Sequence, residues 1–156
     1  MKGLRGEGAK GLRVTIFFTL KPFGSQEEIM LKSYRDLIAW QKAYDLCLKI
    51  YTLTNSFPKE EKYCLTSQMR RAAISIPSNI AEGYGRKTLP DYVRLLYIAF
   101  GSYCELETQM SVAADLKYLD EADKKSVGQM MIEVGLVLKS LIRALEKKLK
   151  GEGLRV

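Results

Sequence analysis

The stretch from Gln68 to Lys87 reads QMRRAAISIPSNIAEGYGRK, and its spacing of polar and apolar residues decides the fold. Polar side chains recur at steps of three or four, which on a helix places them along one stripe: Arg71, Ser75, Ser78, Glu82 and Arg86. Apolar side chains fall on the other side, where a core is expected: Met69, Ala72, Ala73, Ile76 and Ile80. This pattern predicts an amphipathic helix whose polar stripe is either a partly buried network or a solvated surface.

Two residue types predict the shape of this helix. Pro77 has no N–H, and its ring presses on the carbonyl of Ala73, so a kink is expected there. Gly83 and Gly85 supply the backbone freedom that ends a helix. We therefore expect a helix that bends at its proline and stops at its glycines.

Hydrophobic periodicity continues on both sides and predicts four helices, over 34–54, 58–84, 88–116 and 120–148, with Thr88 and Asp120 as caps. The first helix carries a seam at steps of three and four: Leu37, Trp40, Tyr44, Cys47 and Tyr51. Trp40 is expected to anchor the core, with a binding platform as the alternative. The predicted fold class is all-α, an up-and-down four-helix bundle with a kinked second helix.

The third predicted helix has two apolar seams. The first is Tyr92, Leu96, Ala99, Tyr103, Leu106, Met110 and Ala113; the second is Val93, Tyr97, Phe100 and Cys104. A surface helix of a monomeric bundle needs only one such stripe. The pattern therefore predicts burial on two sides, either inside the bundle or against another subunit. Gly101, in mid-helix, is expected where another backbone approaches closely.

The fourth predicted helix combines an apolar core side with a basic row. The core side is Val127, Met130, Met131, Val134, Leu138, Leu141 and Leu145; the row is Lys139, Arg143, Lys147 and Lys150. Like charges at this spacing repel by roughly 0.2–0.5 kcal/mol per pair. Either an anionic partner offsets this repulsion or the row serves solubility.

Several of these segments together resemble a known family. The strings RRAAISIPSNIAEGYGR and AFGSYCELETQM, with Tyr34-Arg35-Asp36-Leu37 and Trp40-Gln41-Lys42-Ala43 before them, resemble the 23S rRNA-intervening-sequence (S23) proteins, which are small four-helix bundles. The resemblance covers about Leu31 to Lys148. That family is similar in fold to the accessory proteins of diversity-generating retroelements, which form pentamers and bind a reverse transcriptase and nucleic acid. The resemblance therefore strongly implies the architecture of a four-helix bundle and also implies a homopentamer. It implies an activity only weakly.

Charge and composition bound the domain organisation. The chain has 156 residues, 47% of them apolar, and a formal charge of +7. Residues 1–33 hold six basic and three acidic residues, and residues 34–150 hold eighteen and fourteen. We expect residues 1–30 to be a disordered or non-native extension, residues 31–149 to be the bundle, and residues 150–156 to be a flexible tail.

Residue usage argues against most kinds of chemistry. The chain has no histidine and no Cys-x-x-Cys pair, so a zinc site and a His-dependent nucleophile are not expected. Cys47, Cys64 and Cys104 are expected to be buried free thiols in a reducing cytoplasm, with Cys64 near Lys62 as the one candidate for reactivity. No phosphate-binding glycine loop occurs. We expect no enzyme activity, no cofactor, no membrane span and no small-molecule substrate.

Two functions remain open. The leading hypothesis is a homo-oligomeric scaffold that binds RNA or a nucleic-acid-processing protein, such as a reverse transcriptase, through basic residues: Arg70, Arg71, Arg86, Lys87, Arg94, Lys139, Arg143 and Lys147. The alternative is a protein-only interaction module whose arginines close a polar network with Ser75, Asn79, Glu82 and Glu105.

Overall fold

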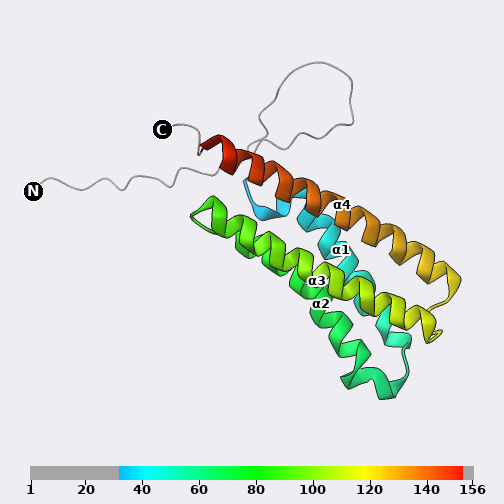
Figure 1. The fold of residues 1–156 in the computed structure, drawn as a ribbon. Helices are drawn as coiled ribbons and strands as arrows, with labels where there is room; N and C mark the ends of the chain where they lie inside the picture. Colours follow the sequence, from blue (N-terminus) through cyan, green and yellow to red (C-terminus); the bar gives the residue numbers. More distant parts are fainter. Residues whose placement is uncertain (1–31, 153–156) are drawn as a thin grey trace, which may run out of the picture.

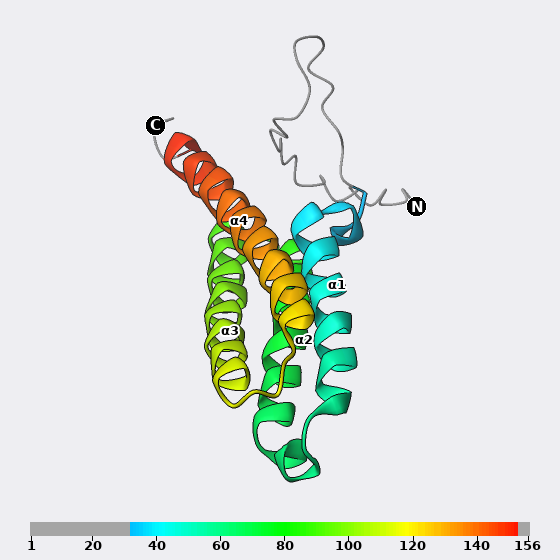
Figure 2. The same ribbon diagram turned by 90° about the vertical axis from the view of Figure 1, so that its right-hand side faces the viewer.

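The computed structural model describes residues 32–152, and these residues form helices joined by short turns, without strands. The four long helices are α1 (Ile38–Leu53), α2 (Leu65–Tyr84), α3 (Leu89–Asp115) and α4 (Glu121–Glu152) (Figure 1). Each runs antiparallel to the next, so α1 and α3 start at the end of the bundle where α2 and α4 finish, as Figure 2 shows. The all-α prediction is confirmed. The expectations for residues 1–30 and for 153–156 lie outside the described residues.

The start of α1 differs from the prediction because the chain is extended at Leu37, with ψ at 121°. Tyr34–Asp36 therefore form a separate 3-10 turn. Ser33 caps this turn, since its hydroxyl accepts a hydrogen bond from the Arg35 N–H at 3.2 Å while the Asp36 carboxylate accepts one from the Ser33 N–H at 3.0 Å.

The predicted seam of α1 is wrong at Tyr44 and Tyr51, whose side chains are exposed. The helix instead buries a side that contains small residues: Ala39, Ala43, Leu46, Cys47, Ile50 and Leu53. Alanines allow the neighbouring helices to approach, whereas the tyrosines lie on the rim. Trp40 is half-buried against the core and stacks on Tyr44, with 5.0 Å between ring centroids.

α2 begins at Leu65, later than predicted, because Lys59–Tyr63 form a separate 3-10 helix. All five residues expected on its apolar side are buried. The helix is continuous through Pro77, and the predicted kink stays a prediction. The Ser78 hydroxyl donates to the Ile74 carbonyl at 2.7 Å, one residue beyond the Ala73 carbonyl that loses its helical donor at Pro77.

Gly83 does not end α2, contrary to the prediction. It lies buried within the helix, where an added Cβ would be 2.7 Å from Cδ2 of Tyr92 on α3. Glycine is thus needed there because the two helices approach closely. Gly85 follows the helix with φ at −77°, a conformation open to other residues.

α3 and α4 confirm most of the predicted core. The caps are as expected, since Thr88 accepts a hydrogen bond from the Asp91 N–H at 3.3 Å and Asp120 accepts one from the Asp123 N–H at 2.7 Å. The first seam of α3 and the core side of α4 are buried, except for the partly buried Met110 and Met130. The prediction missed the buried Leu95 and Ile142.

The second seam of α3 is only partly covered in one chain. Val93 is buried and Phe100 is half-buried, whereas Tyr97 and Cys104 are exposed. A Cβ added at Gly101 would meet no atom within 4 Å, so the close approach expected there does not occur within one chain.

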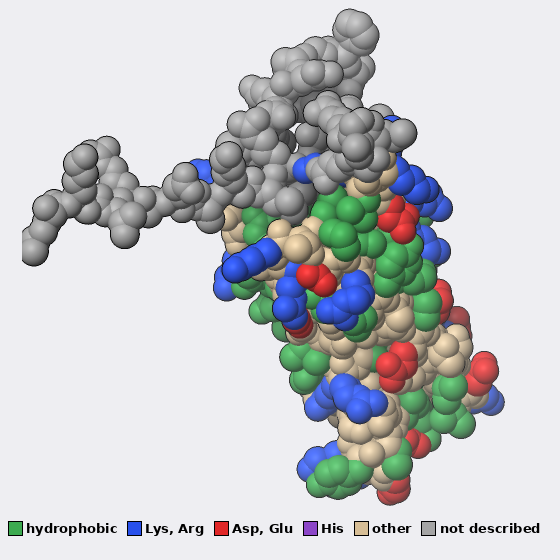
Figure 3. Space-filling model, turned by 60° about the vertical axis from the view of Figure 1, so that its left-hand side comes forward, with side chains coloured by type: hydrophobic (Ala, Val, Ile, Leu, Met, Phe, Trp, Pro, Cys, Tyr) green, Lys and Arg blue, Asp and Glu red, His purple; other side chains and the backbone are tan. Residues whose placement is uncertain are grey.

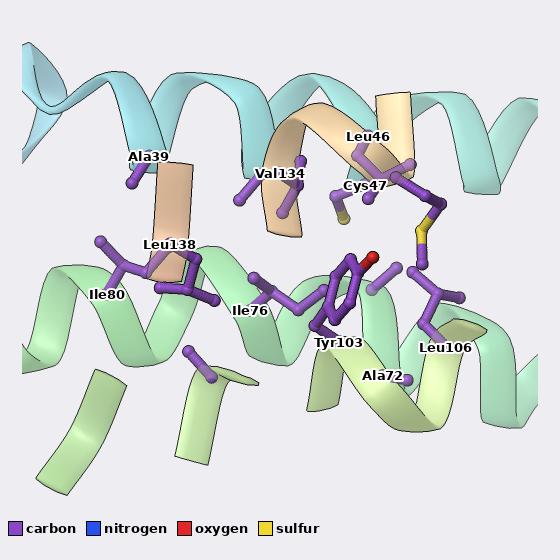
Figure 4. Close-up of a cluster of buried hydrophobic side chains, with 14 of the residues drawn as sticks. Ala39, Leu46, Cys47, Ala72, Ile76, Ile80, Tyr103, Leu106, Val134 and Leu138 are labelled. Atoms are coloured by element: carbon purple, nitrogen blue, oxygen red, sulfur yellow. The ribbon is translucent and has the colours of Figure 1, made fainter. Parts of the chain in front are cut away.

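Side chains from all four helices meet in one core (Figure 4). In that view Ala39, Leu46 and Cys47 of α1 face Val134 and Leu138 of α4 and the apolar sides of α2 and α3. Tyr103 of α3 lies over Gly135 of α4, where an added Cβ would be 2.8 Å from the tyrosine hydroxyl oxygen. One core therefore holds all four helices in place, and with them the side chains at the ends of the bundle.

Candidate nucleic-acid interface

The net charge of the described chain gathers at one end of the bundle. We define the basic end as residues 32–36, 82–94 and 143–151, which lie at the same end of the bundle because α1 and α3 start where α2 and α4 finish (Figure 2). It holds nine Lys and Arg residues against four Asp and Glu residues. The opposite end, residues 52–64 and 115–125, holds five against six. A polyanion would therefore be attracted to one end and not to the other.

Arg70 does not belong to a free basic surface, contrary to its place among the candidates. Its guanidinium donates to the Thr54 hydroxyl at 2.8 Å and to the Asn55 side chain at 2.9 Å, and it lies 5.0 Å from the centroid of the Tyr51 ring. These contacts fasten α2 to the last turn of α1. The role of Arg70 is thus structural.

Three further arginines are partnered by residues three or four positions away in the sequence. Arg71 donates to Gln68 at 2.9 Å, Arg86 pairs with Glu82, and Arg94 lies 4.0 Å from Asp91. All three side chains are exposed. Exposed pairs of this kind contribute little to stability.

The remaining candidates carry no carboxylate partner among the described residues. Lys87, Arg143 and Lys147 are exposed, and Lys139 lies 5.1 Å from the centroid of the Phe100 ring. Lys150, in the same row of α4, is exposed as well. Figure 3 shows one face of the molecule, where blue and red side chains are interspersed rather than gathered in one continuous patch. On that face, basic side chains therefore alternate with acidic and apolar ones.

The predicted polar network is smaller than expected. Ser75 bonds to Ser102 of α3 at 2.8 Å, and Asn79 donates to the Ser75 hydroxyl at 3.0 Å. Glu82 pairs with Arg86, which is one of the expected contacts between an arginine and the network, but both side chains are exposed. Glu105 accepts a hydrogen bond from Gln109 at 3.1 Å and faces solvent, so it is not the partner of an α2 arginine.

Shifted pKa values occur where α4 contacts α1 and α3. Hydrogen bonds from Lys42 and Gln129 lower the pKa of Glu133. The hydrogen bond from Tyr97 to Glu146, 2.6 Å long, raises the pKa of that phenol. Burial raises the pKa of Tyr103 to about 12, and Glu107 adds to the shift. These groups stabilise helix contacts, and none of them faces a second reactive group.

Comparison with known proteins identifies the family. The family profile described as 23S rRNA-intervening sequence protein matches residues 35–140. The chain belongs to this family. The match spans the candidate cations Arg70, Arg71, Arg86, Lys87, Arg94 and Lys139, whereas Arg143 and Lys147 lie beyond it.

A solved structure shares the fold of this 23S rRNA-intervening sequence family member. It is a protein of unknown function from the S23 ribosomal protein family of Bacteroides thetaiotaomicron, with 23% sequence identity and a TM-score of 0.64. The alignment covers 70% of this chain and 98% of that one. No curated protein matches the chain. At this identity the likeness shows the fold alone.

Other candidate chemistry finds little support in this family member. Cys47 is buried, but Cys64 and Cys104 are exposed, so the prediction of three buried thiols is wrong. In residues 32–152 no three His, Cys, Asp or Glu side chains are placed to hold a metal. The helices in the same range are too short or too polar to cross a membrane.

Sequence reasoning missed Lys32 and Arg35 as members of the basic end. Both precede α1, while the other basic members lie between α2 and α3, in the first turns of α3 or in the last turns of α4. Each sits far from the others in sequence, so a search for local charge runs does not find them. Pairing the helix ends of the predicted up-and-down topology would have placed them together.

Proposed function

We propose that the protein is a non-enzymatic, homo-oligomeric helical scaffold that binds RNA through its basic end. The observation that carries the proposal is the uneven charge, with nine basic and four acidic residues at one end and five and six at the other. Nucleic acids, which carry one phosphate per nucleotide, are polyanions that such a surface attracts strongly. The absence of histidine from the sequence supports a binding role over an acid–base one.

The outward side of α3 supports self-association. Tyr97, Ile98 and Val112 are each 43% to 50% exposed, although they are large and apolar. Gly101 lies among them with open space above it. A second copy packed on this side would cover these residues. Five copies are what the resemblance to retroelement accessory proteins implies.

Salt dependence tests the RNA-binding part of the proposal. Binding of a structured ribosomal RNA fragment to the full chain should weaken steeply as salt rises, because each neutralised phosphate releases a counterion. Arg143→Gln with Lys147→Gln should weaken binding, while Lys59→Gln with Lys125→Gln, which removes the same charge from the opposite end, should not. Binding that ignores salt, or equal loss in both double variants, contradicts the assignment.

Native mass measurement tests the oligomeric part. A single species of several subunits is expected for the full chain, and Ile98→Asp should shift it toward single chains. A wild-type protein that remains a single chain at micromolar concentration would refute self-association through α3.

A protein-only interaction module is the second candidate. The observation that favours it is Arg70, whose guanidinium serves the fold rather than a ligand. If the other cations are equally structural, their loss will lower stability and leave no RNA affinity to lose. Absence of RNA binding by a correctly assembled wild-type protein would support this candidate.

A further inference from the structure

We infer that the ligand of the basic end is the phosphate backbone of double-helical RNA, held without contact to its bases. This inference rests on the proposed function and makes it more specific. Three features carry it: the kind of cation left unpaired, the state of the nearby aromatic rings, and the separation of the cations in the fold.

The unpaired cations at the basic end are mostly lysines. Arg86 and Arg94 are paired with Glu82 and Asp91, and Arg35 lies 5.7 Å and 6.0 Å from the ring centroids of Tyr34 and Trp40. An arginine fork is the group that reads a guanine edge through two parallel hydrogen bonds. Lysine presents a compact point charge, which suits a phosphate and lacks the planar fork of arginine. In the α2–α3 turn and on α4, the exposed cations without a carboxylate partner among the described residues are Lys87, Arg143, Lys147 and Lys150, and Lys32 before α1 has none either.

The aromatic rings at this end are already occupied. Tyr34 packs edge-on against Trp40 at 5.3 Å, and Tyr84 packs edge-on against Tyr92 at 6.4 Å. Tyr97 lies just outside this end, with its hydroxyl bonded to Glu146 and its side chain 50% exposed. Proteins that hold single strands stack the unpaired bases on exposed aromatic faces. The described part of the basic end lacks such a free platform, so bases that are already stacked in a duplex fit it better.

The cations stand on two separate elements. Lys87 lies in the turn between α2 and α3, while Arg143, Lys147 and Lys150 follow one line of α4 at steps of four and three. Those steps correspond to about 6 Å and 4.5 Å along the helix axis. A duplex offers phosphates on two strands at once, so one strand can meet the α4 row while the other meets the α2–α3 turn.

The test measures binding of the full chain to four labelled probes over a range of salt concentrations. The probes are two RNA duplexes of equal length and unrelated sequence, an unstructured single strand of the same length, and a DNA duplex. With four phosphate contacts the slope of log K against log salt should be about −3.6, given roughly −0.9 per contact for a duplex. Lys87→Gln with Lys147→Gln should reduce its magnitude by about 1.8. Lys59→Gln with Lys125→Gln serves as the control with equal loss of charge.

Equal affinity for the two RNA duplexes, weaker binding of the single strand, and a reduced slope only in the basic-end variant support the inference. Tighter binding of the single strand, a clear preference between the duplex sequences, or tighter binding of DNA overturns it while RNA binding itself survives. A slope that falls equally in the control variant overturns the placement at the basic end. Failure of every nucleic acid to bind rejects the proposed function as well.

Discussion

Both sides of α3 carry large apolar side chains, but in opposite surroundings. On the inner side Leu96, Ala99 and Leu106 are fully buried, and Tyr92 packs on Gly83 of α2. On the outer side Tyr97, Ile98 and Val112 are large and apolar yet substantially exposed. Gly83 of α2, which faces the inner side, has no room for a methyl group, whereas Gly101 on the outer side of α3 has open space around it.

This contrast separates what one chain can satisfy from what it leaves for a partner. An apolar side chain stabilises a fold only when its surface is removed from water. The inner side achieves this within the bundle. The outer side would achieve it only in an assembly, so substitutions on the two sides should affect different measurable quantities.

The largest expected difference is between Leu96→Ala and Ile98→Ala. Leu96 is 0% exposed, and its truncation should lower the free energy of unfolding by about 2–5 kcal/mol through lost burial and a cavity. Ile98 is 43% exposed, so its truncation should cost less than about 1 kcal/mol in a single chain. Urea unfolding measures both. Equal losses in protein that native mass measurement shows to be single chains would erase the contrast.

Gly83→Ala should be the next most damaging change. Alanine normally favours a helix over glycine by about 0.5–1 kcal/mol, but here the methyl group would strike the buried Tyr92 ring and Leu95, an overpacking cost of about 1–3 kcal/mol. The net expectation is a loss of about 1–2 kcal/mol in urea unfolding. A stabilised variant would show that α2 and α3 can separate without cost.

Alkaline pH should weaken the inner side through Tyr103. Its folded-state pKa is raised to about 12 while an unfolded tyrosine titrates near 10, so its contribution is complete below about pH 10 and is lost as the pH rises toward 12. One phenol shifted in this way loses about 1 kcal/mol by pH 11. Urea unfolding at pH 8 and pH 11 should therefore show a smaller pH-dependent loss in Tyr103→Phe than in the wild type. An unchanged loss would assign the alkaline sensitivity to other groups, such as Tyr92, whose pKa burial also raises.

Gly101→Ala should have the smallest effect on the single chain and the opposite sign to Gly83→Ala. With no atom within 4 Å of the added methyl group, the variant should gain about 0.5–1 kcal/mol from helix propensity alone. If a second copy packs closely on this glycine, the same variant should dissociate at higher protein concentration than the wild type. Native mass measurement over a dilution series distinguishes the two effects, and an unchanged dissociation point would show that no backbone approaches there.

The fold was predictable from sequence where periodicity and burial agree. The apolar residues of α2, α3 and α4 recur at steps of three and four, which predicts helices that bury these residues. The caps at Thr88 and Asp120 mark where two of these helices start. The prediction failed on α1, because Tyr44 and Tyr51 match a heptad seam by size and spacing while Ala39 and Ala43 are buried. Periodicity weights large side chains, but close helix packing is decided by small ones.

The candidate site was predictable only in its chemical type. Basic residues on α4 and around Arg86 are visible in the sequence. The residues next to Arg70 do not show, however, that its guanidinium donates hydrogen bonds to Thr54 and Asn55, sixteen and fifteen positions away. In the same way, the pairing of Ser75 with Ser102 and the position of Lys32 at the same end of the bundle as Lys87 depend on how the helices are arranged in space. Such pairings are three-dimensional, so composition and spacing do not contain them.

The unequal ends of the bundle give the molecule an electrical direction as well as a shape. Because lysine and arginine are in excess at one end, the field of a distant polyanion exerts a torque on the molecule. This torque turns the basic end toward the polyanion before any atoms touch. An encounter complex would then form already oriented, which speeds productive collisions and makes the rate fall as dissolved salt shortens the reach of the field. The up-and-down connectivity, by returning the chain twice to the same end, is what creates this orientation.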